Sequence, residues 1–85
     1  MKQELRKLLG SGKLVIGTER SLKTLAAGKA KKIILSANCS DSTKAKMETL
    51  AKTAGAELEV AKENNEELGV LCRKPFRIAV LCITQ

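Results

Sequence analysis

The chain has 85 residues, of which 44% are hydrophobic and 29% are charged, and its formal net charge at pH 7 is +7. This length leaves room for a single domain, residues 1–85, and the hydrophobic share argues against disorder. Histidine is absent, which excludes His-based triads, His general bases and His metal ligands.

The first 28 residues predict a helix, a strand and a second helix. The opening helix is indicated by an i, i+3, i+4 stripe of Leu5, Leu8 and Leu9. Gly10-Ser11-Gly12 ends it, and residues 14–16 form a short apolar strand. Gly28 closes the second helix, whose apolar stripe consists of Leu22, Leu25 and Ala26.

The middle of the chain predicts a strand, a longer helix and another strand. Residues 33–35 are apolar, and Ser40 or Asp41 can cap the helix that follows. That helix ends at Gly55, and its apolar stripe consists of Met47, Leu50, Ala51 and Ala54. In residues 56–60 glutamates alternate with apolar residues, which is typical of a half-exposed edge strand. We expect these elements to form a right-handed crossover unit.

The last part of the chain predicts a short helix, a break and a buried strand. Residues 64–71 have a helical pattern, Pro75 interrupts the chain, and residues 78–83 are apolar without a gap. A strand that is apolar on both faces belongs inside a sheet with helices above and below it. The alternation therefore predicts an α/β fold, a three-layer α/β/α sandwich around four strands.

The positive charge is concentrated in one part of the chain. Residues 1–35 hold nine Lys or Arg and two Glu, whereas residues 36–85 hold seven residues of each sign. The whole excess therefore falls in the first part, which favours a one-sided basic surface and a polyanionic partner. The alternative is a charged face that serves solubility alone.

The three cysteines predict neither disulfides nor a metal site. Cys39, Cys72 and Cys82 have no C-x-x-C spacing, and Cys82 lies in an apolar run that predicts a buried thiol. We expect a reducing, cytoplasmic setting and no cofactor. The chain has no apolar run of about 18 residues and no leader pattern, so we expect a soluble protein without a membrane segment.

The first candidate site is the junction between the first strand and the second helix. Gly17 lets another backbone come close, and Thr18 is a credible N-cap. Free amides at a helix start favour an anion, and Arg20 and Lys23 lie within about the first turn. The junction therefore suits a phosphate or a base edge, although a capped helix without a ligand fits the same residues.

Two further segments could contribute to binding. Asn38 could hydrogen-bond a base, although capping or turn formation is the commoner role of such a residue. The segment 67–77 combines a Gly turn, three cations and Phe76, the one aromatic residue of the chain. Phe76 could stack on an unpaired base, whereas a lone Phe beside a core strand more often belongs to the core. We expect an acidic face turned away from nucleic acid, formed by Glu57, Glu59, Glu63, Glu66 and Glu67.

Six short motifs occur in a fixed order along nearly the whole chain: Gly12-Lys13-Leu14-Val15-Ile16-Gly17, Ser21-Leu22-Lys23, Gly28-Lys29-Ala30-Lys31, Ala37-Asn38-Cys39, Glu67-Leu68-Gly69 and Lys74-Pro75-Phe76-Arg77. In order and spacing they resemble the L-thirty-e branch of the ribosomal protein L-seven-Ae family. The resemblance implies an α/β/α sandwich with a four-stranded mixed sheet. It also implies a structural protein of the large ribosomal subunit, cytoplasmic, monomeric when free and without enzymatic activity.

The resemblance further implies binding of kink-turn or similar internal-loop RNA through loops at one end of the sheet. Gly17 would permit close approach, Lys23 would meet a phosphate, and Val70 with Leu71 would cover an extruded base. The positions that match this RNA-binding surface are Gly17, Thr18, Glu19, Arg20, Lys23, Asn38, Gly69, Val70, Leu71 and Phe76.

The chain departs from the family pattern at two places. Kink-turn specialists usually carry Asn-Glu where this chain has Glu19-Arg20, the residues that would face sheared purine pairs. Arg73 stands where a Gly is common, and it would stiffen the loop or add a phosphate contact. Two alternatives stay open: a regulatory or protein-interaction module of the same fold outside the ribosome, and a small enzyme that uses Cys39, which lacks an evident base.

Overall fold

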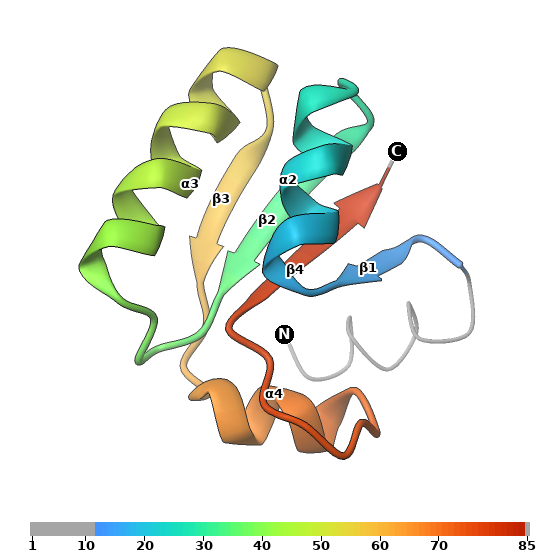
Figure 1. Cartoon of the computed structure of the whole chain (residues 1–85), viewed down its shortest axis with the longest axis vertical. Helices are drawn as coiled ribbons and strands as arrows, with labels where there is room; N and C mark the ends of the chain where they lie inside the picture. The colour runs from blue at the N-terminus through green and yellow to red at the C-terminus, as the bar shows by residue number, and fades with distance from the viewer. Residues whose placement is uncertain (1–11, 85) are drawn as a thin grey trace.

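A computed structural model of the chain describes residues 12–84 (Figure 1). The elements in these residues are β1 (Leu14–Ile16), α2 (Thr18–Ala26), β2 (Ala30–Leu35), α3 (Asp41–Ala54), β3 (Glu57–Val60), α4 (Asn65–Leu71) and β4 (Val80–Thr84). The expected opening helix with Leu5, Leu8 and Leu9 lies outside the described residues. Every other predicted element is present, in the predicted order.

The four strands form one mixed sheet in the order β1-β4-β2-β3. β4 runs antiparallel to both β1 and β2, whereas β2 and β3 are parallel and are joined through α3. β3 lies at an edge, as its alternating glutamates predicted. β4 lies inside the sheet, as its uninterrupted apolar residues predicted.

Helices cover both faces of the sheet, which confirms the three-layer α/β/α sandwich. On one face Leu25 of α2 and Met47 of α3 pack with Ile33, Val80 and Cys82 of the sheet. On the other face α4 supplies a second cluster, in which the buried residues are Ile34, Ala61, Leu68, Cys72, Ile78, Leu81 and Ile83. None of the helices within residues 12–84 combines the length and the apolarity that crossing a membrane requires.

Local signals explain most of the helix boundaries. Ser40 is the N-cap of α3, where its Oγ accepts a hydrogen bond from the Thr43 amide at 3.4 Å, and Gly55 ends the helix with a left-handed φ of 72°. In α2 the predicted stripe is wrong at one position, because Ala26 is exposed and Ser21 is buried with Leu25 instead. The helix therefore presents an i, i+4 pair to the sheet.

The last strand begins two residues later than its apolar run predicted. Ile78 is buried, but its amide donates to the Asn65 carbonyl oxygen at 2.9 Å rather than to a neighbouring strand. The Ala79 carbonyl oxygen accepts a hydrogen bond from the Ser36 amide at 2.9 Å. The beginning of the run thus joins the end of the sheet to α4 and to the turn after β2.

Cys82 makes the stability of the fold sensitive to alkaline pH. Burial raises the pKa of its thiol from 9.0 to about 11. The raised value means that stability is fully present below pH 9 and is lost as the pH rises toward 11, because the unfolded chain ionises first. We expect a loss on the order of 2 kcal/mol in the free energy of unfolding.

Urea unfolding followed between about pH 8 and about pH 11 measures this loss. Cys82→Ala is the control, because it removes this thiol and leaves every other side chain of the protein in place. The wild type should lose more stability across this range than the variant does. Equal pH dependence of the two proteins would contradict the assignment.

Candidate nucleic-acid interface

The topology of the sheet brings three turns to the same end of the molecule. β1 and β2 leave the sheet where β4 enters it, so Ile16 pairs with Leu81 and Leu35 pairs with Val80. The Gly17 amide donates to the Val80 carbonyl oxygen at 3.1 Å. Figure 1 shows the ends of β2 and β3 and the start of β4 converging next to α4. The turns after β1 and β2 and the turn before β4 therefore lie together, as the proposed binding surface requires.

The first turn is built around Gly17 rather than Thr18. Gly17 is the N-cap of α2, with φ 108° and ψ 153°, and no side chain caps this helix; Thr18 is its first residue, so the predicted Thr18 cap is wrong. A φ of 108° is unfavourable for a residue with a Cβ, whereas glycine adopts it readily. The first amides of α2 are consequently left without a side-chain acceptor, which suits an anion.

Glu19 and Arg20 project from the first turn of α2, whereas Lys23 lies in its last turn, further from the helix start than the sequence predicted. All three side chains are exposed. Within the part of the chain that the structure describes, neither Arg20 nor Lys23 forms an ion pair. Both cations are therefore available to an external phosphate, together with the uncapped start of the helix.

Asn38 in the second turn is held by a residue 27 positions away. Its Oδ1 accepts a hydrogen bond from the Asn65 amide at 2.9 Å, and its Nδ2 donates to Asn65 Oδ1 at 3.2 Å. Asn38 therefore satisfies an amide at the start of α4 and ties the second turn to that helix. It does not cap α3, the helix that follows it, because Ser40 does so.

Sequence reasoning missed Asn65 and the reason for its position. Asn64 is the N-cap of α4, where it accepts from the Glu67 amide at 2.8 Å, while Glu67 Oε1 accepts from the Asn64 amide at 3.1 Å. This capping box was visible in the sequence as an Asn followed three residues later by a Glu. It places Asn65 in the first turn of the helix, where Asn38 reaches it.

The end of α4 and the third turn, which follows this helix, each expose one large apolar side chain. Val70 is 73% exposed and Phe76 is 54% exposed, whereas Leu71 is half-buried against the core. The interpretation of Phe76 as a core residue is therefore wrong. Its exposed ring has the position that a stacking role demands.

Gly69 lies beneath this turn and is buried. A Cβ at Gly69 would overlap the Phe76 carbonyl oxygen, so only glycine lets the turn approach α4 this closely. The family resemblance implies that Gly69 is part of the binding surface itself. The structure instead gives it a positioning role under Val70 and Phe76.

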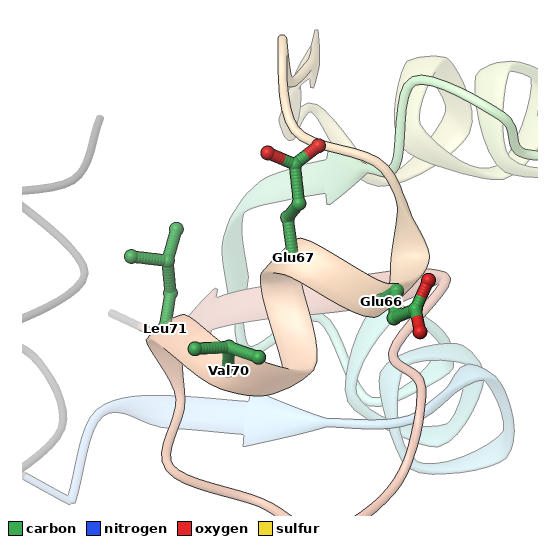
Figure 2. Close-up of a pocket in the computed structure, with 4 residues that line it drawn as sticks. All are labelled: Glu66, Glu67, Val70 and Leu71. Carbon is green, nitrogen blue, oxygen red and sulfur yellow. The ribbon is translucent and has the colours of Figure 1, made fainter.

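An open pocket of about 400 Å³ lies along α4, lined by Glu66, Glu67, Val70 and Leu71. Figure 2 shows these four side chains on the helix. The glutamates of α4 are thus neighbours of Val70 and Leu71 rather than part of a distant acidic face. The expected separation of an acidic face from the binding surface is wrong for this helix.

The cysteines lack the properties of nucleophiles. Burial raises the pKa of the Cys39 thiol, with Lys44 opposing this effect and Asp41 adding to it. Burial also raises the pKa of the Cys72 thiol. The reactive species is the thiolate, so a raised pKa disfavours catalysis by Cys39 at neutral pH. Among residues 12–84, no three or more His, Cys, Asp or Glu side chains gather as a metal site would require.

Comparison with known proteins places this geometry in context. A family model described as "Ribosomal protein L7Ae/L30e/S12e/Gadd45 family" matches residues 1–85. The large ribosomal subunit protein eL30 of Trypanosoma brucei brucei is 38% identical over 81 residues, which cover 95% of this chain and 77% of that protein. The eL30 protein of Sulfolobus acidocaldarius is 38% identical over 80 residues, covering 94% of this chain and 77% of that protein. The solved structure of a Giardia lamblia 15.5kD RNA binding protein has the same fold, with a TM-score of 0.82, 17% identity, and coverage of 99% of this chain and 70% of that chain.

Asn38→Ala removes both hydrogen bonds to Asn65 and leaves an amide of α4 without its acceptor. We expect a loss of about 1–2 kcal/mol in the free energy of unfolding, as for other lost helix caps. Asn38→Asp is the matched control, because it keeps the acceptor and loses the Nδ2 donor, and its loss should be smaller. Urea unfolding measures both, and equal losses would show that the acceptor has no special role.

Proposed function

The chain belongs to the ribosomal protein L7Ae/L30e/S12e/Gadd45 family, and on this premise we propose that it is a structural RNA-binding protein of the large ribosomal subunit. The observation that carries the proposal is the convergence of three turns at one end of the sheet, with exposed cations and exposed apolar side chains among them. The chain would act by binding and shaping ribosomal RNA in the cytoplasm, without catalysis.

The start of α2 would bind the RNA backbone. Its first amides have no side-chain cap, Arg20 is exposed beside them, and Lys23 is exposed in the last turn of the same helix. Backbone amides at a helix start and nearby cations are the usual partners of phosphate groups. Gly17, which has no Cβ and open space around it, would let the RNA backbone approach the turn closely.

The turn around α4 would bind bases. Val70 and Phe76 are mostly exposed apolar side chains, and Leu71 lines the same pocket as Val70. Apolar and aromatic side chains stack on unpaired bases that internal loops extrude. The family resemblance makes a kink-turn, with its extruded base and sheared purine pairs, the internal loop that we propose.

Glu19 and Arg20 would decide which internal loops bind well. A carboxylate repels phosphates, so Glu19 has a favourable role only if it accepts hydrogen bonds from base amino or imino groups. Arg20 can donate either to a purine edge or to a phosphate. We therefore propose that these two residues contribute to selectivity, while Lys23 contributes to affinity for any RNA backbone.

Binding to a kink-turn hairpin should exceed binding to a plain duplex of the same length. The duplex offers phosphates but no extruded base for Val70 and Leu71. Binding to both should weaken as salt rises, because each neutralised phosphate releases counterions. Filter binding over a salt series measures both properties. Equal affinity for the two RNAs would contradict the kink-turn proposal, and absence of binding to either would contradict RNA binding itself.

Substitutions in α2 should separate affinity from selectivity. Lys23→Ala should weaken binding to kink-turn and duplex RNA alike, roughly tenfold at low salt. The salt slope, which is the slope of log affinity against log salt concentration, should be smaller in magnitude by about 1. Glu19→Ala should instead change the ratio of the two affinities. Lys52→Ala, on the exposed surface of α3, is the control for general loss of charge. Unchanged affinities for both site variants would refute this assignment of the site.

A further inference from the structure

The three helices within residues 12–84 all end in the same hydrogen-bond arrangement. After each helix, one amide donates to the carbonyl oxygen three residues back and the next amide donates to the one five residues back, with N···O distances of 2.9 to 3.3 Å. This arrangement needs a left-handed residue at the first or second position after the helix. The left-handed residues are Gly28 after α2 (φ 72°), Gly55 after α3 (φ 72°) and Arg73 after α4 (φ 57°).

Arg73 is unusual among these three because it has a side chain. In the left-handed conformation a Cβ crowds the carbonyl oxygen that follows, which is why glycine is the common residue at this position. Arg73 is the one residue other than glycine with a positive φ in the described part of the chain. Its conformation therefore costs stability that Gly28 and Gly55 do not cost.

The described structure offers Arg73 little compensation for this strain. Its side chain is exposed and forms no ion pair or side-chain hydrogen bond with residues 12–84. A cation just beyond a helix C-terminus interacts favourably with the helix dipole, but Lys74, the next residue, can supply the same effect. No contact within residues 12–84 therefore accounts for an arginine at this position.

The surroundings of Arg73 indicate what it would contact. Its amide donates to the Val70 carbonyl oxygen at 3.0 Å, so it lies close to the exposed Val70, and the exposed Phe76 is in the same turn as Arg73. Lys74 and Arg77 in the same turn are also exposed cations, and the turn contains no acidic residue. A guanidinium has a planar fork of donors that matches the oxygens of a phosphate.

We propose that Arg73 binds an RNA backbone phosphate next to the base held by Val70 and Leu71, and that the contact compensates for its strained conformation. The inference rests on the proposed function, because it adds a second phosphate contact to the one at the start of α2. The backbone of the bound RNA would then be held at two points, the start of α2 and the turn after α4.

Arg73→Gly tests both parts of this proposal in one protein. Glycine relieves the strain, so the melting temperature should rise, by about 4 °C for a domain of this size. The same change removes the guanidinium, so affinity for a synthetic kink-turn hairpin should fall roughly fivefold to tenfold, with a salt slope smaller by about 1. A more stable protein that binds RNA less well is an outcome that general damage to the fold does not produce.

Two further variants complete the experiment. Arg73→Lys keeps the charge without the fork, so the salt slope should stay close to that of the wild type while part of the affinity is lost. Lys52→Gln removes one exposed cation from the last turn of α3 and should leave affinity within about twofold of the wild type.

Three results would overturn the proposal in different ways. An Arg73→Gly protein with wild-type affinity and salt slope would show that Arg73 does not contact phosphate. A lower melting temperature for Arg73→Gly would show that the arginine stabilises the fold, contrary to the strain argument. Failure of the wild-type protein to bind the hairpin would overturn the proposed function itself, and this assignment with it.

Discussion

The hydrogen bonds that β4 makes along both of its edges determine where every part of the proposed surface lies. β4 is antiparallel to β1 on one side and to β2 on the other, so its first residues meet the last residues of both neighbours. The Val80 carbonyl oxygen accepts from Gly17, and the Ala79 carbonyl oxygen accepts from Ser36. These two contacts join turns that are more than 40 residues apart in the sequence. A shift of register by one residue would turn the buried side chains of β4 to the wrong faces, so core packing protects the arrangement.

Much of the fold was predictable because the pattern of apolar and polar residues along each element reflects which of its faces is buried. The alternation of Glu57 and Glu59 with apolar residues reports one exposed face, and β3 is an edge strand. The apolar run of 78–83 indicates burial as well. Burial alone does not show whether the backbone amides of a segment bond to a neighbouring strand or to another part of the chain. Ile78 is as buried as a strand residue should be, yet its amide is bound to Asn65. The pattern therefore predicted the core correctly and placed the start of the strand too early.

The candidate site was less predictable, because its geometry depends on contacts between distant segments. The types of residue at the turns could be seen in the sequence, but the pairing of Asn38 with Asn65 across 27 positions could not. The same holds for Phe76. A lone aromatic residue beside a core strand is usually buried, whereas here the Phe76 backbone lies against Gly69 and the ring is exposed. No local signal in the sequence reveals this contact between α4 and the turn that follows it.

The distribution of charge along α4 suggests how a bound RNA would be oriented. The helix begins with Glu66 and Glu67, and exposed cations follow its end at Arg73 and Lys74. Seven residues of helix span about 10 Å, which is close to the Debye length at physiological salt, so the two ends present distinct potentials to a ligand. In the proposed complex, phosphates would be repelled from the start of α4 and attracted to its end. A base edge, which carries neutral donors, can lie beside the glutamates where a phosphate cannot. The acidic residues near the pocket are therefore compatible with RNA binding, because they favour a base over the backbone at that point.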